Sequence, residues 1–351
     1  MFREFQIQNN SPERQQAQQT APGIAAGEPR PHPTPYNDGN RAFLQAFIAR
    51  GAMTFKEAQP ILAAIFTTQE NEPVNPNDVT QEDFASYVSA ASNAISLFDM
   101  DIRSTLHQKS RERVWAIINT SSDPMTQLAT LHSAEEIAFV KRVIDAMFEK
   151  YNSPRMEVMA LDEMQANKLR TAPRPAQEDE DMEDAGNQPS TQALKGLKSS
   201  EAEAMMRSMV DEGWFERSRE GLYSLTPRAL LELRSWLLES YNDPDAEEGE
   251  WQRVKFCEAC KEIVTVGQRC SDVTCMARLH DICEAAFWRT RRAQTCPKCD
   301  KEWDGQHFVG EKAVTETQAY QRGRRRSKGA RNSNMMEQIM QNGDDEEVDE
   351  D

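Results

Sequence analysis

The chain has 351 residues and a formal net charge of −17 at pH 7, from 58 acidic and 41 basic residues. This length allows about two or three domains, and no stretch approaches the roughly 18 apolar residues of a membrane span, so we expect no membrane contact. Three runs, residues 178–184, 243–250 and 344–351, hold eighteen acidic residues and account for the whole excess. The rest of the chain is therefore close to neutral. Acidic runs of this kind are typical of solvated linkers and tails.

The N-terminal residues 1–35 are rich in Gln, Pro, Ala and Asn and offer little for a core to bury, so we predict a disordered tail. Order begins near Asp38, which can cap a first helix. Two capping boxes predict two further helices: Thr54 with Glu57, and Thr80 with Asp83.

A β-hairpin follows, because residues 102–106 and 114–118 read as two strands joined by a polar turn. Three helices and a hairpin are the pattern of a winged helix, which we place at residues 36–123. Residues 57–102 contain no Lys or Arg, so the third helix lacks the cations that phosphate contact needs. Only weak, non-specific DNA contact is expected, through the cations of the hairpin: Arg103, Lys109, Arg111 and Arg113.

A second winged helix is predicted at residues 124–250, interrupted by a disordered acidic insertion at residues 171–190. Its helices are signalled by Ser133 with Glu136, by Ser200 with Glu203, and by Thr226 before a proline. Five apolar side chains supply more apolar surface than one small unit needs, and we predict that they contact a partner protein: Met205, Met206, Met209, Trp214 and Phe215.

All seven cysteines lie between residues 257 and 299, where with one histidine they form four short pairs: Cys257 with Cys260, Cys270 with Cys275, His280 with Cys283, and Cys296 with Cys299. An odd cysteine count and an opening without a signal peptide argue against disulfide bonds and for a reducing, intracellular setting. Thiolates select zinc over Ca²⁺ or Mg²⁺, and an iron–sulfur cluster is the alternative. The eight ligands suit two tetrahedral zinc ions.

The zinc-binding unit, residues 251–304, is too short to bury a sufficient core without metal. Structural zinc contributes about 10–16 kcal/mol in small finger peptides, so we expect metal to stabilise this unit. Because protein side chains supply every ligand, neither ion keeps an open position for water, and zinc-dependent hydrolysis is not expected.

The order of ligands, four cysteines, one histidine and three cysteines, resembles the variant RING and PHD finger group. The resemblance implies interleaved pairs, with one ion held by Cys257, Cys260, His280 and Cys283 and the other by Cys270, Cys275, Cys296 and Cys299. PHD fingers usually carry a tryptophan where this chain has Gln294. RING domains grip a ubiquitin-conjugating enzyme (E2) by a surface that corresponds here to Ala259, Phe287, Trp288 and Pro297. The alternative is that these side chains only form the small core.

Two winged helices followed by such a finger resemble the non-SMC element one family, a subunit of the Smc five-six complex, in a fungal-type form. The matching segments are Asn40-Arg-Ala-Phe-Leu-Gln and Glu57-Ala-Gln-Pro-Ile-Leu in the first unit, and Gly213-Trp-Phe and Gly221-Leu-Tyr-Ser-Leu-Thr-Pro-Arg-Ala-Leu-Leu-Glu-Leu in the second, together with the eight ligands. The expected fold is mainly α (α+β): tandem winged-helix domains and a variant RING-like zinc finger, with disordered tails. The resemblance implies a nuclear, chromosome-bound subunit in DNA repair and recombination, which binds MAGE-type and kleisin partners and acts as a ubiquitin ligase.

Two functional hypotheses follow. The first is a RING-type E3 ubiquitin ligase subunit that positions a charged E2, with no covalent intermediate on this chain. The second is a non-catalytic assembly or DNA-contacting module whose finger is a structural or PHD-like clip, favoured by the small Ala259 and by Asp300, where many active RING domains carry a basic residue. Residues 305–351 are predicted to be a disordered tail, and its basic cluster, residues 322–331, fits an import signal or a nucleic-acid contact.

Overall fold

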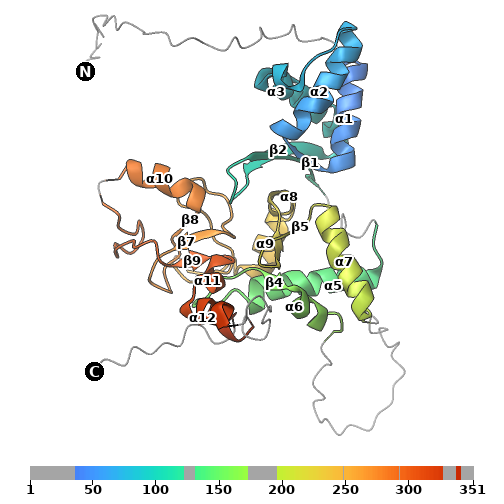
Figure 1. The fold of residues 1–351 in the computed structure, drawn as a ribbon. Coiled ribbons are helices and arrows are strands. Elements are labelled where there is room, and N and C mark those ends of the chain that lie inside the picture. Colours follow the sequence, from blue (N-terminus) through green and yellow to red (C-terminus); the bar gives the residue numbers. More distant parts are fainter. Residues whose placement is uncertain are drawn as a thin grey trace, which may run out of the picture.

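The computed structural model describes residues 36–121, 131–172, 196–247, 249–291, 293–326 and 337–340. The predictions for residues 1–35, for most of the acidic insertion and for part of the basic cluster lie outside these ranges. Three parts are arranged around a central hairpin, with the first helical unit at the top of Figure 1, the second at the lower right and the zinc-binding finger at the lower left. The first unit has a core of its own, whereas the second unit and the finger share one.

The first unit contains three helices and a three-stranded antiparallel sheet. Its helices are α1 (Asp38–Arg50), α2 (Phe55–Glu70) and α3 (Gln81–Ile95), with short 3₁₀ turns η1 (Pro76–Asp78) and η2 (Ser96–Phe98). Its strands are β1 (Ala52–Thr54), β2 (Met100–Leu106) and β3 (Arg113–Asn119), in the order β1-β3-β2. The predicted winged helix is therefore present, with a third strand that the sequence did not signal.

Local capping explains where these helices begin. The Thr54 amide donates to Glu57 at 2.7 Å and the Thr80 amide donates to Asp83 at 2.9 Å, as the two capping boxes predict. The cap of α1 is Asn37, one residue earlier than predicted. The side-chain oxygens of Asn37 and Asn40 each accept from the other residue's backbone amide at 3.0 Å. Behind the caps, aromatic rings meet edge to face and fill the core, among them Phe43, Phe47, Phe84 and Tyr87.

The second unit repeats the plan. Its helices are α5 (Ala134–Asp145), continued by a π-helical turn η3 (Ala146–Lys150), then α6 (Glu163–Lys168), α7 (Ser199–Asp211), α8 (Pro227–Glu232) and α9 (Arg234–Tyr241). The sheet has the order β4-β6-β5, from β4 (Leu161–Asp162), β5 (Phe215–Arg217) and β6 (Leu222–Leu225). Helix α7 starts before the predicted Ser200 and Glu203 pair, because the Lys198 amide donates to Glu201 at 2.8 Å.

Helix α8 packs against both strands of the first hairpin and so joins the two units. Arg228 on this helix lies over the ring of Trp214 at 4.7 Å and donates to the Glu212 carbonyl at 2.6 Å. The Arg228 guanidinium also lies against Gly51, which closes α1 with φ 70°. A Cβ atom at Gly51 would come within 2.4 Å of the Arg228 guanidinium, so both this contact and the positive φ favour glycine there.

The finger contains a small sheet of order β8-β7-β9 and the helix α10 (Asp281–Arg289). Its strands are β7 (Gly267–Arg269), β8 (Arg278–Leu279) and β9 (Phe308–Val309). Two further helices follow, α11 (Lys312–Thr315) and α12 (Gln318–Arg326). The predicted end of the finger at residue 304 is too early, because β9 pairs with β7 and both Val309 and Val314 are fully buried.

A short C-terminal segment, residues 337–340, also differs from the predicted disordered tail. Ile339 and Met340 are buried, and the Gln165 amide donates to the Met340 sulfur at 3.2 Å. The Glu337 carboxylate pairs with Lys150 and Lys168 on the second unit. Two apolar side chains beside one acid are too weak a pattern to be distinguished from a tail by sequence.

Candidate metal centre

The eight predicted ligands gather into two groups of four, and within each group all the ligand atoms lie within 4.8 Å of one another. One group is Cys257, Cys260, His280 and Cys283, and the other is Cys270, Cys275, Cys296 and Cys299. The pairing is therefore interleaved, as the RING resemblance implied. Sulfur pairs in the second group are 3.4 and 3.6 Å apart, too far for disulfides and close to the roughly 3.8 Å that a tetrahedral zinc–thiolate centre sets. The two groups fit two zinc ions.

Two turns of the same kind present the paired cysteines. In the first, the Cys257 amide donates to the Glu262 carbonyl at 2.8 Å, and Lys261 adopts the left-handed φ of 62°. In the second, the Cys296 amide donates to the Lys301 carbonyl at 2.7 Å, and Asp300 has φ 57°. The residue after each second cysteine thus reverses the chain and points both sulfurs inward. Sequence reasoning treated Asp300 only as a position for ubiquitin contact and missed this backbone role.

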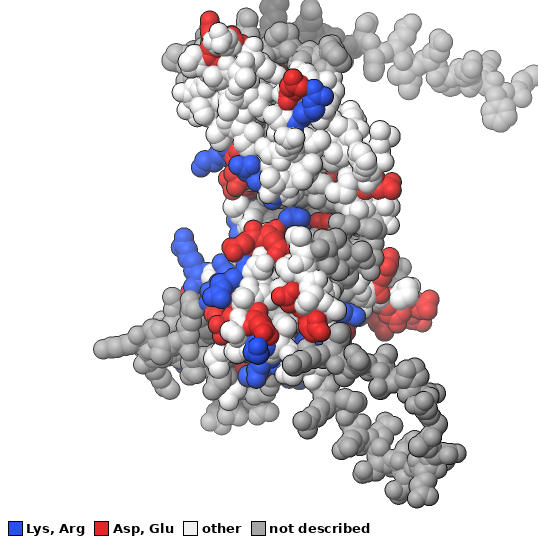
Figure 2. All heavy atoms as spheres, turned by 90° about the vertical axis from the view of Figure 1, so that its right-hand side faces the viewer, with Lys and Arg blue, Asp and Glu red and all other residues white. Residues whose placement is uncertain are grey.

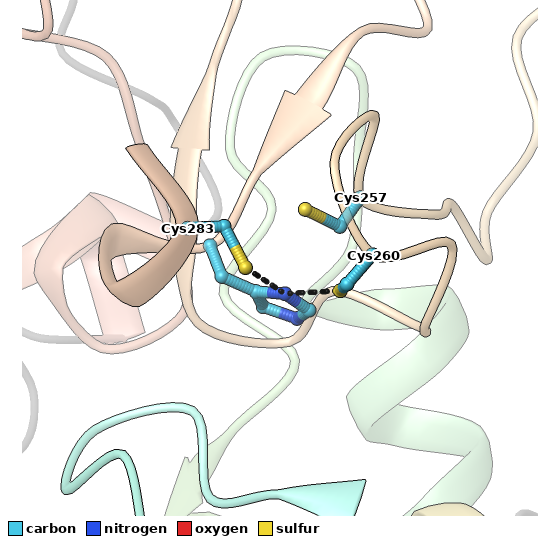
Figure 3. Close-up of side chains that lie close together, drawn as sticks. Cys257, Cys260 and Cys283 are labelled. Atoms are coloured by element: carbon cyan, nitrogen blue, oxygen red, sulfur yellow. Dashed lines mark hydrogen bonds between the residues drawn. The ribbon is translucent and has the colours of Figure 1, made fainter. Parts of the chain in front are cut away.

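The tautomer of His280 follows from its neighbours in the first group. Its Nε2 atom lies 3.1 Å from the Ile263 carbonyl, which can only accept, so Nε2 carries the proton. Its Nδ1 atom lies 3.3 Å from the Cys260 sulfur and 3.8 Å from the Cys283 sulfur, where a lone pair is free to bind metal. Figure 3 shows the sulfurs of Cys257, Cys260 and Cys283 directed toward one another.

The ligand atoms are close enough to change one another's acidity. A hydrogen bond from the Cys260 thiol lowers the pKa of the Cys257 thiol to about 3, and the same contact raises the pKa of Cys260. Burial raises the pKa of the Cys270 thiol to about 11 in the second group. A bound cation favours the thiolate form of every ligand, so metal affinity in both groups falls as the pH falls.

A buried ion pair joins the finger to the second unit. Arg278, beside the second group, is fully buried and its Nε donates to Glu157 at 2.9 Å. Its Nη1 donates to the Cys275 carbonyl at 2.7 Å, so the same guanidinium supports a ligand loop. Lys255 adds a second cation 3.4 Å from Glu157. Burial raises the pKa of Glu157, but the hydrogen bond from Arg278 and the positive charges of Arg278, Lys255 and Arg269 together outweigh burial, and the pKa lies below its ordinary value.

The four predicted E2 contacts differ in exposure. Ala259 is exposed, and Phe287 and Pro297 are partly exposed. Ala259 and Pro297 lie on the tips of the two cysteine turns, which are neighbours because the adjacent side chains Glu258 and Lys298 pair at 3.4 Å. Trp288 is only 8% exposed. It packs between Phe287 and Trp303, with ring centroids 4.9 and 5.7 Å away, so it belongs to the core of the finger.

The five side chains predicted to contact a partner lie inside the second unit. None of Met205, Met206, Met209, Trp214 and Phe215 is more than 5% exposed. The surplus apolar surface is used internally, because the second unit and the finger share one core and need more apolar side chains than an isolated winged helix. A role for these five residues in direct partner contact is therefore wrong for this conformation.

The cations of the first hairpin are largely engaged within the molecule. Lys109 pairs with Glu216 at 2.7 Å, Arg111 donates to the Ile282 carbonyl at 2.6 Å, and Arg103 pairs with Asp101 at 3.2 Å. On the face in Figure 2, the upper unit is largely uncharged and charged side chains gather lower down. This arrangement offers little to a DNA backbone. Within the described ranges, no helix is long and apolar enough to cross a membrane.

Comparison with known proteins matches this architecture to one family. The family model described as "Nse1 non-SMC component of SMC5-6 complex" matches residues 40–233, and a model for a RING-like domain matches residues 257–299. This chain belongs to the Nse1 family. The family is the one that the sequence resemblance indicated, and the fold agrees, with mostly helical units, small sheets and a C-terminal RING-like domain.

Individual relatives are distant but cover most of the chain. "Non-structural maintenance of chromosomes element 1" of Schizosaccharomyces pombe is 24% identical over 78% of this chain and 95% of its own length. The human homologue is 19% identical over 76% of this chain and 84% of its own length. Among solved structures, a chain of an "Nse1-Nse3-Nse4 complex" aligns with a TM-score of 0.57 at 18% identity, over 76% of this chain and 97% of that chain.

Proposed function

We propose that this Nse1-family chain is a RING-type E3 ubiquitin ligase subunit of an SMC5-6 complex, which acts on chromosomes in the nucleus during DNA repair and recombination. The observation that carries the proposal is the pair of closed, interleaved four-ligand groups. All seven cysteines stand in these groups, so no thiol remains to accept ubiquitin. Transfer must then proceed by holding a charged E2 so that a substrate lysine reaches its thioester carbonyl.

The tips of the two cysteine turns and the partly exposed ring of Phe287 form the proposed E2 contact. Ala259 and Pro297 supply small apolar surface on neighbouring turns, and Arg291 lies over the Phe287 ring at 4.3 Å and fixes its orientation. Trp288 is left out of the contact because it is buried. Its role is to keep α10 packed against the sheet of the finger.

The proposed partners are a MAGE-type subunit, Nse3, and a kleisin subunit, Nse4. The structurally similar chain comes from a complex named for Nse1, Nse3 and Nse4, and this supports the same assembly here. We place these contacts on the winged-helix units, although the five buried side chains named above are not among them. Weak DNA contact is not needed for this function.

Discharge of ubiquitin from a charged E2 tests the proposal. We expect slow discharge by the chain alone and a gain of about tenfold with a MAGE-type partner, about 1.4 kcal/mol in barrier. Ala259→Asp, which places a charge on the exposed turn, should abolish the gain. Ala319→Asp, an exposed position on α12, should not. Both variants should keep their zinc.

The competing function is a non-catalytic assembly module with a structural finger. Two residues favour it: the contact at Ala259 is small, and Asp300 is acidic and held in a left-handed turn, so no basic side chain braces ubiquitin there. Absence of discharge both with and without the partner, in protein that retains metal and binds the partner, would establish this second function and overturn the first.

A further inference from the structure

Gln108 occupies an unusual place for a polar side chain at the tip of a hairpin. It lies in the turn between β2 and β3, which the His107 amide closes by donating to the Glu112 carbonyl at 2.8 Å. Turn residues are normally exposed, but Gln108 is only 9% exposed. A buried amide needs partners, and those of Gln108 are in the finger.

The Gln108 side chain bonds the finger backbone in the manner of a neighbouring strand. Its Nε2 donates to the Ile263 carbonyl at 2.9 Å. Its Oε1 accepts from the amides of Thr265 at 3.0 Å and Val266 at 2.8 Å, and from the Thr265 hydroxyl at 3.3 Å. Removing this side chain would take the acceptor away from the amides of Thr265 and Val266, and an unsatisfied buried group costs about 1–3 kcal/mol.

The Ile263 carbonyl links Gln108 to the first ligand group. The same oxygen accepts from Nε2 of His280 at 3.1 Å, so one carbonyl holds both the hairpin and the metal-binding imidazole. Arg111 from the same hairpin donates to the Ile282 carbonyl at 2.6 Å, beside the ligand Cys283. A cavity of about 190 Å³ lies between the hairpin, α8 and this ligand group. The hairpin thus contacts the finger backbone at two points beside the first ligand group, the carbonyls of Ile263 and Ile282.

The second ligand group is supported from a different part of the molecule. Arg278 connects the Cys275 carbonyl to Glu157 of the second unit. Within the described ranges, the hydrogen bonds of Gln108 and Arg111 to the finger reach the surroundings of the first group and not this one. The hairpin of the first unit therefore contacts only the first group's surroundings, whereas the second unit contacts the second group through Arg278 and also the first cysteine turn, through the pair of Arg234 with Glu262 at 2.6 Å.

We propose that Gln108 is a positioning residue for the first zinc site: through the Ile263 carbonyl, the hairpin of the first winged helix fixes the orientation of His280. Zinc retention in that site then depends on how the hairpin is docked. This consequence rests on the proposed ligase function: a partner that binds the first unit and moves its hairpin would also change the position of the E2-binding turn, which begins at Cys257. The metal-binding part of the inference stands without any ligase activity.

Cobalt(II) in place of zinc separates the two sites, because its visible absorption differs between a centre of three cysteines and one histidine and a centre of four cysteines. In the full chain, Gln108→Leu should release metal from the first site to a chelator about tenfold faster and leave the second site unchanged. Gln108→Glu keeps an acceptor oxygen for Thr265 and Val266 but replaces the Nε2 donor to Ile263 by a second oxygen, so it should also release the first metal faster. Glu112→Gln, at an exposed side chain of the same turn, should change neither site.

Glu157→Gln supplies the reciprocal test, because it weakens the support of the second group and should accelerate loss from that site in preference. Equal acceleration at both sites in Gln108→Leu would mean general destabilisation and would overturn the inference. Wild-type release from Gln108→Glu would overturn it too, because the Ile263 link would then be irrelevant. Neither result depends on ubiquitin discharge, so failure of the proposed function is distinguished from failure of this inference.

Discussion

Lys109 and His107 of the first hairpin both contact the carboxylate of Glu216 in the second unit. These two contacts help to hold the winged-helix units together. The Lys109 ammonium lies 2.7 Å and the His107 Nε2 3.1 Å from its oxygens. Burial raises the pKa of Glu216, but the hydrogen bonds and charge interactions with His107 and Lys109 together outweigh it and lower the pKa to about 2, from an ordinary value of 4.5. The contact therefore links pH to stability.

A depressed carboxyl pKa stabilises the fold fully above the unfolded pKa, and this contribution is lost as the pH falls through the folded pKa. We expect Glu216→Gln to lower the free energy of unfolding at pH 7 by about 2 kcal/mol, allowing for partial solvent screening. The difference from wild type should shrink as the pH falls from about 4.5 to about 2. Melting temperatures of both proteins at each pH check this, because loss of zinc affects both alike. A difference that stays constant over this window would contradict the assignment.

At the scale of secondary-structure elements, the approach of α1 to α8 depends on Gly51. Gly51→Ala should destabilise the junction for two reasons, the left-handed φ of 70° and the collision with Arg228. Gly213→Ala is the matched control, because Gly213 has φ 77° but a Cβ there would lie 3.9 Å from Arg228, an ordinary contact.

We expect Gly51→Ala to cost about 1–3 kcal/mol more than Gly213→Ala in chemical unfolding, since only the first variant displaces the guanidinium. The excess should disappear in an Arg228→Ala background, where the collision partner is gone. An equal cost for the two glycines would show that backbone strain alone matters and that the contact with Arg228 does not.

Elements set by local patterns could be predicted from the sequence, and those set by distant contacts could not. The capping boxes at Thr54 and Thr80 and the spacing of the eight ligands involve neighbours along the chain, so their residue types are enough. Strand β9 is two residues long and exists because β7 pairs with it. The buried contacts of Gln108 and Glu157 join residues more than 100 positions apart, and no local pattern signals them.

At the scale of the whole molecule, the parts that share a core determine which of them lose structure when metal is lost. The first unit has its own apolar cluster, whereas the second unit and the finger share one. From the sequence alone, loss of metal is expected to unfold the finger and leave both winged helices intact. The shared core and the buried Glu157 pair change that expectation for the second unit.

Cys257→Ser should therefore lower hydrogen-exchange protection in the finger and in the part of the second unit around Glu157, while protection in α1–α3 stays near wild type. The physical reason is that structural zinc supplies folding free energy to the finger, and the second unit buries its side chains against it. Uniform loss of protection through all three parts would contradict the separate core of the first unit.

Two closed zinc sites underlie the proposed mechanism, and native mass spectrometry of the purified full chain, with elemental analysis, measures them most directly. The expected result is two zinc ions per chain, and removal of both by a strong chelator should unfold the finger. One zinc per chain, or iron with visible absorbance, would contradict the assignment of eight ligands and with it ubiquitin transfer by positioning.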